Sequence, residues 1–157
     1  MSTPAEAIHL LSAAGATVAT CESLTGGMIC GTLTSVPGSS EVVLGGVVTY
    51  ATHIKTTVAG VDRHLIETHG VVSSEVAMAM ATNVRKLFGA DWGIAVTGVA
   101  GPGPHDGVEP GTVWLAVVGP DRSAVVLLEE PGDRDTVRTH VVDRAIIVLC
   151  DMVTRRE

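Results

Sequence analysis

The sequence predicts a three-layer α/β/α sandwich whose sheet is mixed but mostly parallel, and three observations support this prediction. Segments with the hydrophobic spacing of helices alternate with segments of strand length along the 157 residues. The strand-like segments are apolar almost throughout, which is typical of a sheet covered by helices on both faces. A turn signal, GPDRS at residues 119–123, joins the last two strand-like segments into a hairpin. The length suits a single domain over residues 1–157.

The first half of the chain supplies two strands and several short helices. Residues 3–15 begin with a Thr-Pro helix start and carry apolar side chains at helical spacing. Residues 16–22 are a β-branched apolar run of strand length, and residues 26–33 suit a helix. Residues 42–50 are predicted to be a strand whose glycine pair allows close backbone approach. Two short helical segments, each ended by a glycine, follow at residues 52–60 and 62–70.

The second half begins with the clearest helix of the chain, residues 72–89. Ser73 or Ser74 can cap its first turn, and Gly89 is well placed to end it. A last helix runs from about Asp133 to Val153, with valine and alanine side chains at helical spacing on one side. Between the two helices lie three apolar strand candidates, at residues 92–99, 112–119 and 123–130.

Composition narrows the classes of protein to consider. The formal net charge of −7 argues against partners held by general electrostatics, such as nucleic acid or an anionic membrane. We see no signal-peptide pattern at the N-terminus and no apolar run long enough to span a bilayer, so we expect a cytoplasmic protein. The histidines show no metal-ligand spacing, and we expect no metal and no cofactor. The cysteines form no CxxC pair and are expected to be reduced core thiols: Cys21, Cys30 and Cys150.

Small polar residues gather in loops of the predicted sheet. In such sheets, ligands bind where the carboxyl ends of strands meet the N-termini of helices. Backbone N–H groups exposed by glycine-rich loops there suit a phosphate or a developing oxyanion. The alternative is structural: Ser23 or Thr25 is only a helix cap, and the glycines only make turns. The loops in question are residues 22–27, 37–40, 50–55 and 97–103.

Six segments resemble, in order, the signatures of the CinA C-terminal domain family. They are ESLTGG at 22–27, SVPGSSEVVLGGVVTYATHIK at 35–55, HGVVSSEVAMAMA at 69–81, VTGVAGPG at 96–103, PGTVWLAV at 110–117 and GDRDTVR at 132–138. The resemblance implies an α/β/α sandwich and a soluble homo-oligomer whose partner is a small pyridine nucleotide. It also implies a nicotinamide-nucleotide amidohydrolase, which converts nicotinamide mononucleotide to nicotinate mononucleotide and ammonia. The chain resembles the stand-alone form of the family, without the large N-terminal nucleotide-processing domain of many members.

Matched position by position, the resemblance implies roles for individual residues. Ser23 matches the nucleophile, Lys55 the family's lysine, and Thr97 a further active-site hydroxyl. Together with the glycine loops, the resemblance also gives a set of expected substrate-binding residues: Thr25, Gly26, Gly27, Ser40, Tyr50, Gly98 and Arg134.

The sequence departs from the family pattern at two places. Leu24 stands where the family often has Ser or Cys, which changes the packing behind the nucleophile rather than the chemistry. The stretch GPHDGVEPGTV, from Gly103, replaces a loop that usually contains glycine, acidic and lysine residues. This second change bears on the selectivity and the rate of the site.

Amide hydrolysis fits these residue types on chemical grounds. It needs an attacking oxygen, a base, an oxyanion site and an acid for the departing ammonia. A lysine can act as the base only if burial or a nearby cation lowers its pKa. Lys86 has a structural reason to end its predicted helix, whereas Lys55 has none, and base and substrate clamp are both open for it. Glu22 can orient Lys55 or pair with a backbone amide.

Two other classes of function remain open at this point. In the first, the same loops hold a phosphate in a non-catalytic nucleotide-binding or regulatory module, which needs the Lys55 cation but not the Ser23 hydroxyl. In the second, the chain is a structural subunit of an oligomer, and its apolar composition reflects a buried interface.

Overall fold

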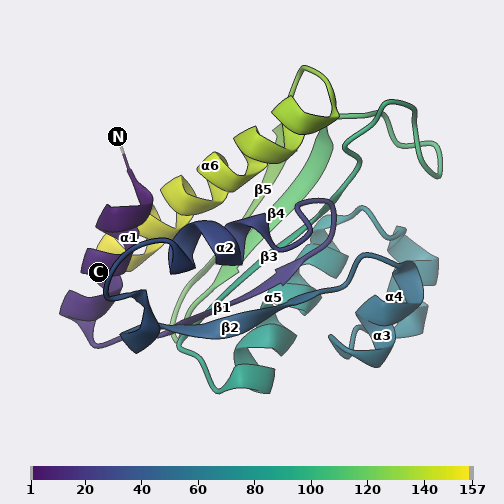
Figure 1. Ribbon diagram of the computed structural model, residues 1–157. Coiled ribbons are helices and arrows are strands. Elements are labelled where there is room, and N and C mark those ends of the chain that lie inside the picture. Colours follow the sequence, from purple (N-terminus) through teal and green to yellow (C-terminus); the bar gives the residue numbers. More distant parts are fainter. Residues whose placement is uncertain (1, 156–157) are drawn as a thin grey trace.

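The structure is a computed structural model that describes residues 2–155, and within them the strands form one five-stranded sheet (Figure 1). The strand order across the sheet is β2-β1-β3-β4-β5. In chain order the strands are β1 (Val18–Glu22), β2 (Val43–Val48), β3 (Trp92–Gly98), β4 (Thr112–Val118) and β5 (Ser123–Glu129).

The sheet is mixed, as the hairpin signal predicts. β1 pairs in parallel with β2 and with β3, whereas β4 pairs antiparallel with both β3 and β5. Among the described residues, four strands therefore point in one direction and β4 runs against them. The carboxyl ends of β1, β2 and β3 lie at the same edge of the sheet.

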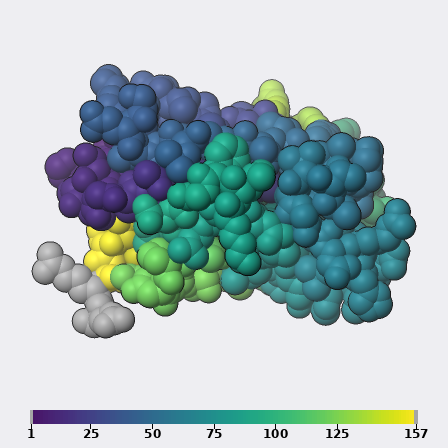
Figure 2. Space-filling view, turned by 90° about the horizontal axis from the view of Figure 1, so that it is seen from below, coloured from purple at the N-terminus to yellow at the C-terminus, as the bar shows by residue number. Residues whose placement is uncertain are grey.

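Helices cover both faces of the sheet, which confirms the three-layer α/β/α sandwich. The apolar side chains of α1, α2 and α6 pack on one face in a single core cluster, and those of α5 pack on the other face. Figure 2 shows the second face, with α5 in teal and the β4–β5 hairpin in green beside it. The helices are α1 (Pro4–Ala14), α2 (Met28–Thr34), α3 (Thr52–Thr57), α4 (Arg63–His69), α5 (Ser74–Phe88) and α6 (Arg134–Thr154), and a 3-10 turn, η1, spans Ser39–Glu41.

Side-chain caps explain why the helices begin where they do. Thr3 accepts a hydrogen bond from the Glu6 N–H at the start of α1, and Ser73 accepts one from the Val76 N–H at the start of α5. Gly89 ends α5 in the left-handed conformation, with φ of 64°. The predicted helix boundaries are thus confirmed to within a few residues.

The interior strand β1 is buried along its whole length, including the Glu22 side chain at its end. The edge strands β2 and β5 are half-exposed, because each has a neighbour on one side only. Cys21 and Cys150 are buried thiols, as expected of core cysteines, and Cys30 is partly exposed. No helix within the described residues is long and apolar enough to cross a membrane.

Candidate active site

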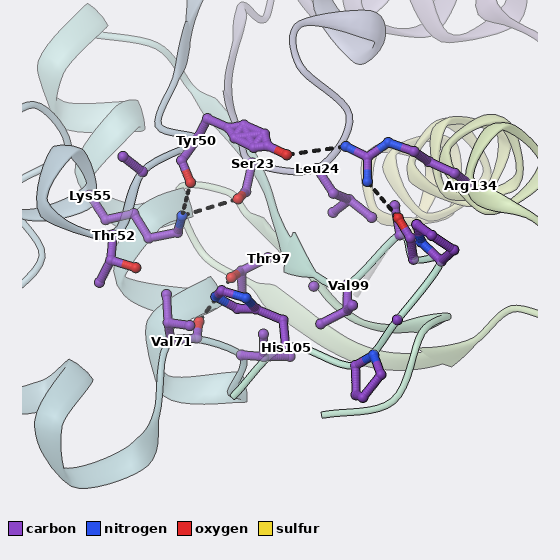
Figure 3. Close-up of a pocket in the computed structure, with 18 residues that line it drawn as sticks. Ser23, Leu24, Tyr50, Thr52, Lys55, Val71, Thr97, Val99, His105 and Arg134 are labelled. Atoms are coloured by element: carbon purple, nitrogen blue, oxygen red, sulfur yellow. Dashed lines mark hydrogen bonds between the residues drawn. The ribbon is translucent and has the colours of Figure 1, made fainter. Parts of the chain in front are cut away.

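A pocket of about 670 Å³ opens at the edge where β1, β2 and β3 end (Figure 3). This volume lies in the range typical of small-molecule sites. Its walls come from segments that are far apart in the sequence: Ser23 and Leu24, residues 50–55, residues 71–72, residues 97–105, and Arg134.

Ser23 lies directly after β1, on a tight loop at the floor of the pocket. Its side chain is nearly buried, with 7% of the residue exposed, and its N–H donates to the Val96 carbonyl at 3.2 Å. Gly26, whose N–H donates to the Ser23 carbonyl at 3.0 Å, has a φ of 57° that only glycine adopts readily. The loop therefore presents the hydroxyl at the end of a fixed strand.

Lys55 extends from the short helix α3 into the pocket and is almost completely buried, with 1% exposed. Its Nζ lies 3.0 Å from Ser23 Oγ and 3.3 Å from the Tyr50 carbonyl oxygen (Figure 3). It also donates to the Thr49 carbonyl oxygen at 2.7 Å. All three acceptors are uncharged oxygens. Because burial disfavours the charged form, the pKa of Lys55 falls from 10.5 to about 8. The amine can therefore take up a proton from Ser23 near neutral pH.

The Glu22 carboxylate supports the serine loop from the side away from the pocket. It pairs with backbone amides at the start of α2, so the structural alternative for this residue holds. Gly27 precedes α2 and has no side chain to cap it. The carboxylate accepts four hydrogen bonds of 2.6, 2.8, 3.0 and 3.3 Å, from Thr25 Oγ1, Ile29 N–H, Cys30 N–H and Thr20 Oγ1.

Among the buried residues of the serine loop, two have a backbone N–H without an acceptor within residues 2–155. They belong to Leu24 and Thr25, which follow Ser23 directly and are buried. Buried donors without a partner are uncommon in folded proteins, and donors of this kind beside a nucleophile are typical of an oxyanion site. Of the two residues, Leu24 lines the pocket, so its N–H is the one suited to stabilise negative charge there.

Thr97 closes another wall of the pocket at the end of β3. Its hydroxyl, on a residue with 1% exposed, donates to the Val71 carbonyl at 2.8 Å. Since the proton of this hydroxyl is committed to Val71, its oxygen acts toward the pocket as an acceptor. It is suited to receive an N–H bond from an amide or from departing ammonia.

Arg134 joins two loops at the mouth of the pocket. Its Nη1 donates to the Gly101 carbonyl at 2.6 Å, and its Nη2 donates to the Tyr50 hydroxyl at 3.1 Å (Figure 3). Within the part of the chain that the structure describes, no carboxylate pairs with this guanidinium. Its positive charge is therefore available to an anionic ligand.

The structure brings most, but not all, of the residues predicted from the sequence to this pocket. Six of them line it: Ser23, Tyr50, Lys55, Thr97, Gly98 and Arg134. Four do not: Thr25, Gly26, Gly27 and Ser40.

The physical reasons differ among the four residues that do not line the pocket. The Thr25 hydroxyl is turned to Glu22, and Gly26 and Gly27 shape the turn below Ser23. Ser40 lies in η1, just before β2, because α2 carries the chain back toward the amino ends of the strands. Within this chain Ser40 therefore lies apart from the pocket.

His105 is a pocket residue that sequence reasoning missed. It belongs to the stretch that departs from the family pattern, and it pairs with Val108 through two backbone hydrogen bonds of 3.0 and 2.9 Å. Asp106 and Gly107 form the turn between them with φ of 49° and 75°. An Asp-Gly dipeptide is a hairpin signal that could have revealed this fold. The altered stretch is therefore a small hairpin that forms one wall of the pocket.

Known proteins resemble this chain both in sequence and in fold. The sequence model of the CinA C-terminal domain family matches residues 2–153 of this chain. A CinA-like protein of Frankia casuarinae is 44% identical over 148 residues, which are 94% of this chain and 33% of that protein. The chain spans about a third of the length of the curated relatives it matches.

Solved structures agree over nearly the whole chain. A CinA superfamily protein from Klebsiella pneumoniae is 30% identical with a TM-score of 0.92, covering 96% of this chain and 94% of that one. The competence/damage inducible protein CihA from Agrobacterium tumefaciens is 32% identical with a TM-score of 0.88, covering 99% of this chain and all of that one.

Proposed function

This chain belongs to the CinA C-terminal domain family, and we propose that it is a nicotinamide-nucleotide amidohydrolase. The reaction converts nicotinamide mononucleotide and water to nicotinate mononucleotide and ammonia. One observation carries the proposal: the buried Lys55 amine lies 3.0 Å from Ser23 Oγ and has a pKa lowered to about 8. A lysine that merely bound phosphate would function best fully charged and would need no serine beside it.

In the first half of the reaction, the neutral Lys55 amine takes the proton of Ser23 as Oγ attacks the carboxamide carbon. The carbonyl π electrons move to oxygen, and the resulting oxyanion is stabilised by the unpaired N–H group of Leu24, which lines the pocket. The C–N bond then breaks as Lys55 returns the proton to the leaving nitrogen. Ammonia departs, and the nicotinoyl group stays on Ser23 as an ester.

In the second half, water replaces ammonia in the same geometry. Lys55 takes a proton from the water, whose oxygen attacks the ester carbon. The tetrahedral species collapses, the bond to Ser23 Oγ breaks, and Lys55 returns its proton to that oxygen. Nicotinate mononucleotide leaves, and the serine hydroxyl is restored.

The pocket suits a mononucleotide in size and charge. None of the described residues that line it is acidic, and Arg134 at its mouth has no carboxylate partner. An anionic phosphate can therefore lie at the mouth while the carboxamide reaches Ser23 and Lys55 at the floor. Within the described chain, no group of three or more metal-ligating side chains gathers, and the proposed steps draw on none.

Ammonia release from nicotinamide mononucleotide tests the proposal. The wild-type protein should release ammonia and nicotinate mononucleotide in equal amounts. Ser23→Ala should lower kcat by several orders of magnitude while nicotinamide mononucleotide still binds, because only the attacking oxygen is lost. Ser12→Ala, which removes an exposed hydroxyl on α1, is the matched control and should leave turnover unchanged.

Two results would contradict the proposal. A wild-type protein that binds the nucleotide and releases no ammonia would be a binding module. Near-normal turnover by Ser23→Ala would move the nucleophile to water or to another hydroxyl, Thr97 first.

A further inference from the structure

Arg138 contacts the serine loop from the side of the C-terminal helix, and the proposed steps do not use it. It lies one turn after Arg134 on α6, and its Nε donates to the Leu24 carbonyl at 2.9 Å. Arg138 and Leu24 are 114 positions apart in the chain. No carboxylate within the described residues pairs with Arg138, so its charge is directed at a peptide carbonyl.

A second contact shows that the guanidinium lies against the loop. A Cβ built on Gly26 would stand 3.4 Å from Nη2 of Arg138. Arg138 therefore contacts the chain on both sides of Thr25, through the Leu24 carbonyl and at Gly26. The partly buried guanidinium covers the outer side of the turn that presents the nucleophile.

The loop is thus held by two side chains of opposite charge, a carboxylate and a guanidinium, which bind different atoms of it. The Glu22 carboxylate holds the Thr25 hydroxyl and the start of α2, while Arg138 holds the Leu24 carbonyl. The peptide between Leu24 and Thr25 is planar, so fixing its carbonyl also fixes the direction of the Thr25 N–H. This N–H and that of Leu24 are the unpaired donors beside Ser23.

We propose that Arg138 is a positioning residue for the nucleophile. Through the Leu24 carbonyl it sets the orientation of the loop, and with it the place of Ser23 Oγ relative to Lys55 Nζ and the direction of the unpaired N–H groups that follow Ser23. The inference rests on the proposed function and deepens it, because it concerns how the same Ser23–Lys55 pair is held. Displacements of about 1 Å in such geometry cost on the order of 100-fold in rate.

Two variants separate the hydrogen bond from the packing of the side chain. Arg138→Met keeps an unbranched apolar stem and loses the donor, and should lower kcat about 10- to 100-fold with little change in KM. Arg138→Lys retains a cation that can donate to the Leu24 carbonyl and should recover part of that loss. Arg144→Ala removes an exposed arginine of the same helix and is the matched control.

A second readout does not depend on the natural substrate. The rate at which a fluorophosphonate labels Ser23 reports the position and activation of its oxygen. Arg138→Met should slow labelling in parallel with kcat, whereas Arg144→Ala should label at the wild-type rate. If the wild-type protein labels rapidly but releases no ammonia from nicotinamide mononucleotide, the proposed function fails, and the labelling rates still decide the role of Arg138.

Thermal unfolding of each variant completes the test. The Arg138→Met variant could melt below the wild type and still label and turn over at wild-type rates. This result would overturn the inference, because the contact would then be structural only. Equal losses in Arg138→Met and Arg138→Lys, with both folded, would also overturn it. If Arg138→Met fails to fold, Arg138→Lys decides alone: wild-type labelling there supports the hydrogen bond, and labelling as slow as background contradicts it.

Discussion

Lys55 is a buried cation whose hydrogen-bond acceptors are all uncharged oxygens. A carboxylate beside it would raise its pKa and keep it protonated, whereas carbonyl and hydroxyl oxygens accept hydrogen bonds from either form of the amine. Burial therefore dominates, and the pKa falls to about 8. This choice of neighbours makes the residue suitable as a base, and it has consequences for both rate and stability.

The rate of nucleotide hydrolysis should rise with pH as Lys55 loses its proton. We expect log(kcat/KM) to increase with a slope near one below about pH 8 and to level off above it, because only the neutral amine can take the proton of Ser23. Initial rates of ammonia release in buffers of constant ionic strength measure this profile. A profile that is flat from pH 6 to 9 would contradict the assignment of Lys55 as the base.

Lys55→Arg separates a base from a clamp. A guanidinium keeps its charge, so the variant should lose nearly all turnover if Lys55 takes the proton. If Lys55 only binds the substrate, the variant should retain much of kcat and show its loss in KM. Steady-state kinetics of the variant beside the wild type give the answer, and an active arginine variant would reassign Lys55 to anion binding.

The same lowered pKa predicts how stability depends on pH. Between about pH 8 and 10.5 the unfolded chain holds a proton on Lys55 that the folded chain has lost. The free energy of unfolding should therefore rise with pH in this window, by up to about 1.4 kcal/mol per pH unit. Below about pH 8 both states are protonated, and the cost of burying the charge is present in full.

Lys55→Met provides the reference for that measurement, since every other titrating group is common to both proteins. Urea unfolding near pH 7.5 and near pH 9.5 should show the wild type gaining stability relative to the variant at the higher pH. A difference that stays constant between the two conditions would mean that the folded and unfolded states share the same pKa.

At the scale of elements, helix ends and strand cores were predictable because their signals are local. Thr3, Ser73 and Gly89 act at the helix ends where their residue types indicate. The turn η1 was missed, since three residues of 3-10 helix carry no periodicity. The hairpin at His105 was also missed, although its Asp-Gly turn is a local signal, because the stretch was interpreted only as a departure from the family pattern.

The packing of α5 on β3 depends on the absence of a side chain at Gly93. A Cβ there would overlap the Ala81 carbonyl oxygen of α5 and come within 3.1 Å of Arg85 Cβ. Gly93→Ala should therefore lower the free energy of unfolding by about 2–3 kcal/mol, because backbone rather than a flexible side chain has to move. Denaturant unfolding of the purified variant measures this loss.

Gly31→Ala is the matched control for that substitution. It lies within α2, where a Cβ would meet nothing within 4 Å, and alanine favours the helix. We expect it to stabilise the protein by about 0.5–1 kcal/mol. Equal effects at the two glycines would show that space between α5 and β3 does not limit the fold.

At the scale of the whole molecule, the sequence predicts the layers but not the order of the strands. Alternating helix and strand periods with apolar strands are enough to predict an α/β/α sandwich. The order β2-β1-β3-β4-β5 depends on how each connection crosses the sheet, which no local pattern specifies. For the same reason Ser40 was expected in the pocket, while the structure places it beyond the far end of α2.

The part of the site that was predictable from residue types lies at strand ends. Ser23 and Thr97 follow or close buried strands, and Lys55 stands out because it is one of two lysines. The contact of Arg138 with Leu24 joins residues 114 positions apart and depends on the packing of α6. Such a contact follows from the tertiary fold, so spacing along the chain could not reveal it.

The distribution of the site along the chain also determines when it becomes complete during synthesis. A ribosome makes Ser23 and Lys55 before α6, and domains fold as their segments emerge. The helix that carries Arg134 and Arg138 is α6, which follows the strands in the chain and packs on the face of the sheet shared with α1 and α2. A growing chain that ends before residue 134 therefore holds Ser23 and Lys55 without the helix that carries these two arginines. The proposed activity therefore requires α6 in place as well as the two residues that react.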